Sequence, residues 1–354
     1  MTATAAPSPE GPRGTLLLRV GGVSALLHLR AVAGFAVLAA ALLLAVTTAL
    51  AVGTVPMGPL RSLPALAGAG DPADVLVVQR LRAPRLVAGL LVGAALGVSG
   101  CLMQTLARNR LATPGTVGID DGATAFAVAS VVGASTSLVP SAMALAGAAT
   151  AAALTLGLAG GAGAYGYRFV VVGLGVGAVL GAITSLLLVR APIDAANAAF
   201  PWAVGTLNAR PTTPVALLGL GLAACLPLAL LVGRRLTVLR LTDKVAAGLG
   251  VRVRAARLAA LALAVVCAGL AVAVGGPLGM VALLAPETAR RVCGPYGVPV
   301  LGSALAGAAL VLLADTAGRT VTAPVEVPAG LVTAVVGGPY LIWLLLSSRP
   351  RRLP

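Results

Sequence analysis

The sequence predicts an all-α, polytopic membrane protein with ten transmembrane helices, and three observations support this. Of the 354 residues, 59% are hydrophobic and only 10% are charged, whereas about a quarter of an ordinary soluble domain is charged. Charge-free runs of about 20 residues, the length of a membrane-crossing helix, recur along the chain. The basic residues gather in short clusters between these runs.

Six charge-free runs are each suited to one crossing. The run Gly122–Tyr167 is long enough for two helices and breaks at Ser135–Pro140. The run Leu258–Pro286 is ambiguous, because Gly275–Gly276–Pro277 interrupts it. The six single runs, in chain order, are Ala31–Leu60, Leu86–Ala107, Phe169–Val189, Pro211–Gly233, Val292–Ala314 and Val327–Ser348.

The basic clusters resolve the ambiguous run. Basic loops prefer the cytoplasmic side of the membrane. If all the clusters lie on that side, the chain must cross the membrane an even number of times between one cluster and the next. Leu258–Pro286 is then a helical hairpin with its turn at Gly275–Pro277. The count becomes ten, with both termini and the loop Arg234–Arg257 in the cytoplasm. The clusters are Arg13/Arg19/Arg30, Arg108/Arg110, Arg168, Arg234–Arg257, Arg290/Arg291 and Arg349/Arg351/Arg352.

The net charge of +15 is therefore a topology signal. We predict no nucleic-acid partner, because the basic residues lie in short loops and form no soluble basic domain. Membrane lipid is the expected surrounding. Of the 25 basic residues, seven are predicted to lie outside: Arg61, Arg80, Arg82, Arg85, Arg190, Arg210 and Arg319.

The predicted organisation is one membrane domain with short tails. Residues 1–30 are rich in proline and glycine and are expected to form a disordered, basic cytoplasmic tail; they do not resemble a cleavable signal peptide. Residues 31–348 form the ten-helix domain, and 349–354 a second cytoplasmic tail. Glycines four residues apart predict close packing between helices. One set is Gly89, Gly93 and Gly97 on the second span, and the other is Gly173, Gly177 and Gly181 on the fifth. Both are expected to pack within the chain, and a dimer interface is the alternative for the fifth span.

Side chains suited to chemistry are scarce, so we expect no catalytic, metal or cofactor site. None of the ten acids falls at the middle of a predicted span, which argues against an ion-coupled secondary transporter. The only lysine, Lys244, lacks the preceding glycines of a phosphate-binding loop. The chain is therefore predicted to be no enzyme, and to form a transport pathway driven by another protein.

The longest cytoplasmic loop is the candidate contact for such a driving protein. Between Arg234 and Arg257 it carries seven basic residues and a single acid, Asp243. Thr242 can cap a short helix that ends near Gly250. A helix displayed there suits a cytosolic motor, but a plain loop held by lipid headgroups fits equally well.

Six segments, in register, resemble the FecCD family of ABC importer permeases, which serve ferric siderophores, haem and cobalamin. The resemblance extends from about Gln79 to the C-terminus. The segments are RLRAPRLVAGLLVGAALGVSGCLMQTLARNRLATPGTVGIDDGA (Arg80–Ala123), PWAVGTLNAR (Pro201–Arg210), AAGLGVRVRAARLAALALA, GGPLGMVALLAPETARR, LLADTAGR and VEVPAGLVTAVVGGPYLIWLLL.

The resemblance implies the type II ABC importer architecture, with ten helices per permease subunit in the bacterial cytoplasmic (inner) membrane. It implies a second permease subunit (the same chain or a related one), two cytosolic ATPase subunits that bind the ATP, and an extracytoplasmic substrate-binding lipoprotein. The expected function is import of a ferric siderophore. Cobalamin or haem import is the nearest alternative, and an ion-coupled carrier is the alternative from another class.

The resemblance also implies two contact sites. The docking site for glutamates of the binding protein would be Arg82, Arg85 and Arg319; the alternative is that these arginines reach lipid phosphates. The site that couples to the ATPase would be Thr242, Asp243, Lys244, Val245, Ala246, Ala247, Gly248, Leu249, Gly250 and Val251.

Two departures from the family pattern bear on the ATPase contact. The chain reads NRLATPG where the family commonly has NPLADPG, which adds Arg110 and replaces an acid by Thr113. Glu287 follows Pro286 where the family commonly has histidine. We expect Glu287 to pair locally with Arg290 and Arg291, three and four residues along a helix.

Overall fold

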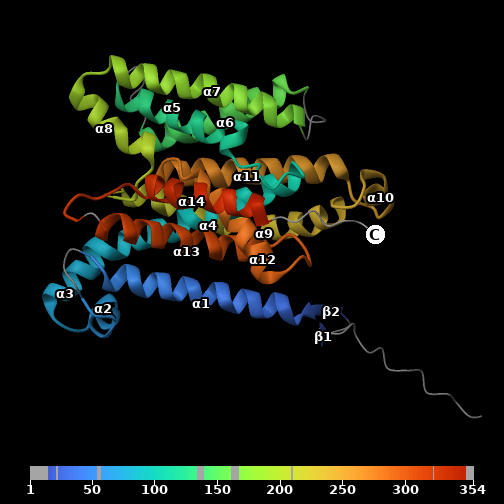
Figure 1. Cartoon of the computed structure of the whole chain (residues 1–354), viewed down its shortest axis with the longest axis horizontal. Helices are drawn as coiled ribbons and strands as arrows, with labels where there is room; N and C mark the ends of the chain where they lie inside the picture. The colour runs from blue at the N-terminus through green and yellow to red at the C-terminus, as the bar shows by residue number, and fades with distance from the viewer. Residues whose placement is uncertain are drawn as a thin grey trace, which may run out of the picture.

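The computed structural model describes residues 15–20, 23–53, 57–133, 139–160, 167–208, 210–321 and 323–347, and most of this part is helical (Figure 1). Its elements are β1 (Thr15–Val20), β2 (Val23–His28), α1 (Leu29–Ala51), α2 (Pro59–Leu66), α3 (Pro72–Leu76), η1 (Val77–Arg82), α4 (Ala83–Leu106), η2 (Gly115–Val117), α5 (Ile119–Val131), α6 (Pro140–Leu158), α7 (Tyr167–Arg190), α8 (Ile193–Val204), α9 (Thr212–Leu239), α10 (Asp243–Gly248), α11 (Val253–Gly275), α12 (Gly279–Cys293), α13 (Val300–Thr320) and α14 (Ala329–Ser347).

Helix α4 is the centre of the bundle. It packs against α13, α11, α12 and α9, and most of its side chains from Ala88 to Leu106 are buried. It can be surrounded because it carries no charged residue after Arg85. Helices α5, α6 and α7 form a group on one side of it, and α1 lies against α13 and α12 on the other (Figure 1).

A glycine seam joins α4 to α13. A Cβ atom placed on Gly93 would lie 2.3 Å from the carbonyl oxygen of Gly307, and one on Gly97 would lie 2.0 Å from that of Ser303. The two backbones therefore touch directly, as helices do in lipid where dispersion must hold them together. This confirms the predicted packing role of these glycines.

The glycines of α7 also pack inside the chain. A Cβ on Gly173 would lie 2.6 Å from the Cα of Val117, and one on Gly177 would lie 2.6 Å from a carboxylate oxygen of Asp121. Of the two alternatives for this helix, the intramolecular one accounts for both positions.

Seven helical runs of the described part are long and apolar enough to cross a membrane: α1, the run from α3 to α4, α6, α7, α9, α11 and α13. Helix α14 is also apolar and is shorter in its described part. Helices α5 and α12 hold 13 and 15 residues, so at about 1.5 Å per residue each is shorter than a bilayer core. The ten elements follow the order of the predicted spans, and the count of ten crossings stays a prediction.

The hairpin predicted for Leu258–Pro286 is confirmed. Helix α11 ends at Gly275, and Gly276 takes a φ of 73°, a left-handed value that suits glycine. Helix α12 starts at Gly279. The break predicted near Ser135–Pro140 is also present between α5 and α6, although residues 134–138 lie outside the described part.

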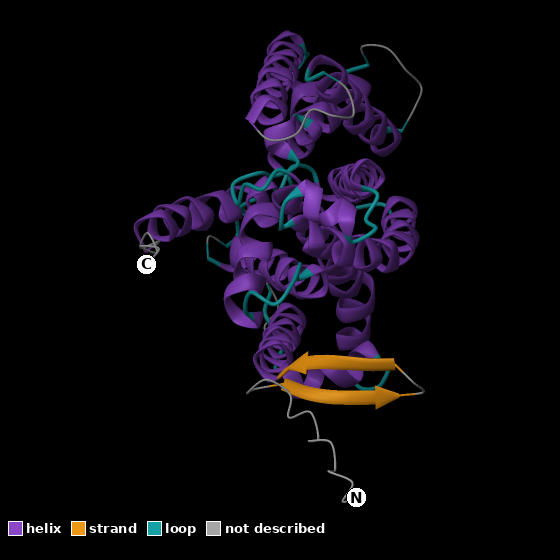
Figure 2. Cartoon of the chain, turned by 90° about the vertical axis from the view of Figure 1, so that its right-hand side faces the viewer, coloured by secondary structure: helices purple, strands orange, loops and turns teal. Residues whose placement is uncertain are grey.

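The N-terminal tail was predicted to be disordered, and this is wrong for its second half. Strands β1 and β2 form an antiparallel hairpin in which Thr15 pairs with His28 and Val20 with Val23 (Figure 2). The missed signal is two short apolar segments separated by Gly-Gly, a common hairpin pattern. Residues 1–14 and the predicted tail 349–354 lie outside the described part.

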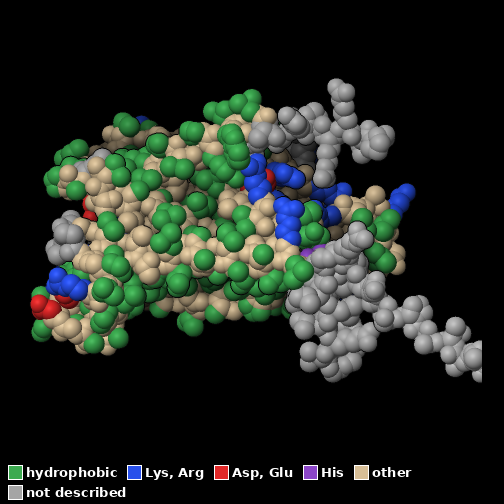
Figure 3. Space-filling view, turned by 60° about the horizontal axis from the view of Figure 1, so that its bottom comes forward, with side chains coloured by type: hydrophobic (Ala, Val, Ile, Leu, Met, Phe, Trp, Pro, Cys, Tyr) green, Lys and Arg blue, Asp and Glu red, His purple; other side chains and the backbone are tan. Residues whose placement is uncertain are grey.

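The surface has the character of a membrane protein. Charged side chains gather near the two ends of the bundle, and apolar side chains are spread over the flank between them (Figure 3). On α1, for example, Leu43 is 68% exposed and Leu44 is 63% exposed. Such a flank suits hydrocarbon as its solvent.

Candidate functional site

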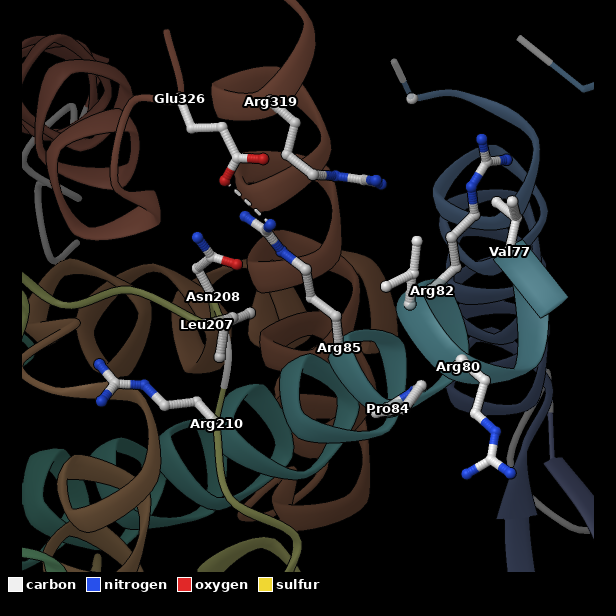
Figure 4. A pocket seen from close by; sticks show the side chains of 12 residues that line it. Val77, Arg80, Arg82, Pro84, Arg85, Leu207, Asn208, Arg210, Arg319 and Glu326 are labelled. Atoms are coloured by element: carbon white, nitrogen blue, oxygen red, sulfur yellow. Dashed lines mark hydrogen bonds and ion pairs between the residues drawn. The ribbon is translucent and has the colours of Figure 1, made fainter. Parts of the chain in front are cut away.

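The three arginines predicted for docking meet in one cavity of about 410 Å³, where α1 and α13 end and α4 begins (Figure 4). We call it the arginine pocket. It gathers five arginines and a single acid, so its lining is strongly basic. The lining residues are Gly53, Val77, Arg80, Leu81, Arg82, Pro84, Arg85, Leu207, Asn208, Arg210, Arg319 and Glu326.

Arg85 is held by two acids that the sequence analysis did not connect to it. Its Nε lies 3.0 Å from Asp315 Oδ2 and its Nη2 lies 2.9 Å from Asp315 Oδ1, a two-point contact. Its Nη1 donates to Glu326 at 3.0 Å, as Figure 4 shows. The Asp315 side chain is only 6% exposed. Arg85 is thus engaged inside the chain.

Arg82 and Arg319 close the C-terminal end of α1. Arg82 donates to the carbonyl oxygen of Leu50 and, at 3.2 Å, to that of Ala51. Arg319 donates to the carbonyl oxygen of Ala49 at 3.0 Å. The last carbonyls of a helix lack intrahelical partners and carry partial negative charge, so two guanidinium groups satisfy them well.

The structure therefore brings the three predicted arginines together but gives each an internal partner. Only one of the ion pairs in this cluster could be predicted from the sequence. Asp315 stands four residues before Arg319, and their 3.5 Å ion pair follows helical spacing. The Arg85–Asp315 contact joins positions far apart in the chain, and no sequence pattern indicated it.

Two further arginines complete the pocket. Arg80 is exposed. Arg210 lies 4.6 Å over the ring of Trp202 and donates to the Thr206 carbonyl oxygen at 3.0 Å. Burial lowers the pKa of Arg210 to about 10, which still leaves it charged at neutral pH. Both were predicted to lie outside, without a functional role.

The opposite end of the bundle carries the short helix predicted for coupling. Thr242 caps α10 by accepting a hydrogen bond from the Val245 amide at 3.4 Å. Gly250 follows with a φ of 82°, and its amide donates to the Ala247 carbonyl oxygen at 2.9 Å. The predicted cap and glycine terminus of this helix are confirmed.

Helix α10 is anchored on one side and exposed on the other. Asp243 receives Arg108 and Arg257, each at 2.8 Å, which ties the loop to the end of α4 and to α11. Val245 is 48% exposed and Leu249 is 64% exposed. These two aliphatic side chains lie one helical turn apart and are available for contact with another protein.

A buried acid organises the neighbouring arginines. The Glu287 side chain is 3% exposed and pairs with Arg290 and Arg291, each at 3.2 Å, which confirms the predicted local pairs. Arg110 approaches it at 3.5 Å. The two departures from the family pattern, Arg110 and Glu287, therefore contact each other. A cavity of about 260 Å³ beside them is lined by Gln104, Thr105, Arg108, Asn109, Arg110, Arg240, Arg290, Gly297, Val298 and Pro299.

Comparison with known proteins gives a consistent result. The model of the FecCD transport family matches residues 41–347. The achromobactin transport system permease protein CbrC of Dickeya dadantii is 39% identical over 342 residues, covering 94% of this chain and 97% of the relative. The hemin transport system permease protein HmuU of Yersinia pestis is 36% identical over 281 residues, covering 77% and 84%.

The fold is also found among solved structures. A metal-chelate type ABC transporter in an inward-facing conformation superposes with a TM-score of 0.77 at 21% identity, covering 90% of this chain and 99% of that chain. At this identity the likeness concerns the arrangement of the helices.

Proposed function

The chain belongs to the FecCD transport family, and we propose that it is the transmembrane permease subunit of an ABC importer that carries a ferric siderophore across the bacterial inner membrane. The observation that carries this proposal is the similarity to the achromobactin transport permease over 94% of the chain. A relative described as a siderophore transport permease is 35% identical over 80% of the chain. It is a multi-pass membrane protein, and its termini and the loop that holds α10 are assigned to the cytoplasm by the distribution of basic residues.

The energy would come from separate ATPase subunits that contact α10. Helix α10 supports this, because it combines a fixed position with exposed Val245 and Leu249. The nearby Arg108, Arg110 and Arg240 line the adjoining cavity and offer positive charge to an acidic surface. Two permease subunits and two ATPases would form the complete membrane machine.

The extracytoplasmic binding lipoprotein would dock at the arginine pocket. Arg80 and Arg210 offer charges without a carboxylate ion pair among the described residues. Arg82, Arg85 and Arg319 hold the ends of α1 and α13 in place around them. In this arrangement, Arg80 and Arg210 pair with acidic side chains of the binding lipoprotein. The other three arginines add positive potential and hold the walls of the pocket in place.

Haem is the second candidate cargo, because a hemin permease is 36% identical to this chain. The achromobactin relative is favoured by its higher identity and its longer coverage.

The test is transport by the reconstituted complex. The permease, its ATPase and its binding lipoprotein would be placed in liposomes and offered ferric siderophores, haem or cobalamin. We expect ATP-dependent accumulation of a ferric siderophore and none of the other two. Accumulation of haem or cobalamin alone would assign the chain to that cargo, and accumulation without ATP would argue for an ion-coupled carrier.

A further inference from the structure

Two adjacent acids lie deeper in the bundle than their sequence position suggests. Asp120 and Asp121 form the first turn of α5. An Oδ of Asp121 lies 2.6 Å from where a Cβ on Gly177 would stand. Gly177 is about 14 Å along α7 from Arg168 and about 20 Å from Arg190, at 1.5 Å per residue. Asp121 therefore lies well inside the span predicted for α7, with Asp120 beside it, which differs from the expectation that no acid falls at the middle of a span.

One carboxylate oxygen of the more buried acid has no hydrogen-bond partner among the described residues. Asp120 is 5% exposed, and its Oδ1 has no hydrogen-bond partner in the described part of the chain. Thr124 is 7% exposed, and its hydroxyl is likewise without a partner there. Residues four apart share one face of a helix, so an unsatisfied carboxylate and an unsatisfied hydroxyl lie one turn apart.

The walls around Asp120 are backbone and small residues. Its Oδ2 lies 3.1 Å from where a Cβ on Gly115 would stand and 3.3 Å from that of Gly279. Gly279 begins α12, whose N-terminal dipole gives the carboxylate modest support. No described amide of that turn donates to Asp120 Oδ1.

No cation in the described part of the chain neutralises this carboxylate. Neither Asp120 nor Asp121 forms an ion pair with any described residue. Asp121 is itself an acid and adds repulsion. The described titratable side chains on α7, α8, α11 and α12 are Arg168, Arg190, Asp194, Arg254, Arg257, Cys267, Glu287, Arg290, Arg291 and Cys293, and α6 and η2 have none.

We propose that Asp120, together with Asp121 and Thr124, forms a proton-binding site inside the membrane. A buried charge without a partner costs several kcal/mol, and a carboxyl group avoids this cost by taking up a proton. The protonated carboxyl becomes a donor, and the Thr124 hydroxyl beside it can accept. Asp121 is the next residue, and repulsion between two neighbouring carboxylates favours a proton on one of them.

The site makes α5 packing sensitive to pH. With the proton on Asp120, α5 packs against α6 and α7 without a charge at this position. As pH rises, ionisation of Asp120 places a second negative charge beside Asp121. We therefore expect the complex to lose transport on the alkaline side, by about tenfold for each further pH unit once Asp120 ionises.

The direct test is infrared spectroscopy of the purified permease. Protein labelled with carboxyl-¹³C aspartate should show the carbonyl stretch of a protonated aspartic acid at neutral pH, and the band should disappear in Asp120→Asn. Thr124→Val should shift the band, because the hydroxyl partner is lost. The absence of a protonated aspartate band in the unmutated protein, or its persistence in Asp120→Asn, would overturn the proposal whether or not the variants fold well.

Transport provides the second readout, and this arm alone rests on the proposed function. The pH profile of the reconstituted complex should lose its alkaline fall in Asp120→Asn, because asparagine resembles the neutral acid. Asp194→Asn is the matched control, since Asp194 is exposed on α8, and it should keep the unmutated profile. If transport by Asp120→Asn falls at alkaline pH as much as transport by the unmutated complex, the inference is contradicted. This holds even if transport of the proposed cargo is confirmed.

Discussion

Asp315 is the residue on which the arginine pocket depends. It accepts hydrogen bonds from the Nε and Nη2 atoms of Arg85 and lies 3.5 Å from Arg319. Arg319 and Arg82 in turn cap the carbonyls at the end of α1. This buried carboxylate, with Glu326 beside Arg85, offsets the repulsion within the arginine cluster. Its loss is expected to loosen three helices at once.

We expect Asp315→Ala to lower the stability of the purified permease by about 3–5 kcal/mol, the range for breaking a buried pair and leaving a charge unpaired. Thermal unfolding in detergent would measure the change as a lower midpoint. Asp74→Ala is the matched control, because its partner Arg61 is 62% exposed and exposed pairs contribute about 1 kcal/mol or less. Equal midpoints for the two variants would refute the central role of Asp315.

At the scale of the element, α10 shows how a six-residue helix can be held in a fixed position. Its start is fixed by the Thr242 cap and its end by the left-handed turn at Gly250. Asp243 attaches it to Arg108 after α4 and to Arg257 on α11. A displacement of α10 by a partner would therefore pull directly on two of the packed helices at the centre of the bundle.

We expect Gly250→Pro to uncouple ATP hydrolysis from transport while the permease still reaches the membrane. Proline fixes φ near −65°, whereas the chain needs 82° here, and it removes the amide that donates to Ala247. Cargo-stimulated ATPase activity of the complex would report the loss. Gly248→Ala is the control, because a Cβ there meets no atom within 4 Å. Normal stimulation in Gly250→Pro would remove α10 from the coupling pathway.

At the scale of the whole molecule, the sequence predicted what periodicity and charge can express. Charge-free runs located the helices, and the parity of basic clusters was sufficient to identify the α11–α12 hairpin. Contacts between distant residues were beyond this reasoning: Asp315 with Arg85, Arg110 with Glu287, and Asp121 with Gly177. The depth of Asp120 was missed because the chain after α4 leads through η2 to Gly118, which packs beside Gly177 of α7, before α5 begins.

The charge of the whole molecule also makes a prediction about docking. The sequence assigns most basic residues to the cytoplasmic side. Five of the seven assigned to the other side line the arginine pocket. Such a pocket attracts an acidic partner over about a Debye length, near 8–10 Å at physiological salt. It should speed association and orient the binding lipoprotein more than it adds affinity.

We therefore expect Arg80→Glu and Arg210→Glu each to slow association of the binding lipoprotein and to weaken the complex, with the effect shrinking as salt rises. Arg82→Glu, Arg85→Glu and Arg319→Glu should weaken it as well, but with lower thermal stability, because each loses a contact that joins two helices of the bundle. Binding kinetics on immobilised permease in nanodiscs, over a range of salt concentrations, would measure both.

Arg190→Glu is the matched control for this test, because it makes the same charge change at an exposed position on the same side, outside the pocket. It should leave association nearly unchanged. A lipoprotein in which an acid of the docking surface is reversed to arginine should regain binding to Arg80→Glu or Arg210→Glu. If the pocket variants associate as fast as Arg190→Glu at every salt concentration, the pocket does not steer the partner, and its arginines serve only to join α1, α4 and α13.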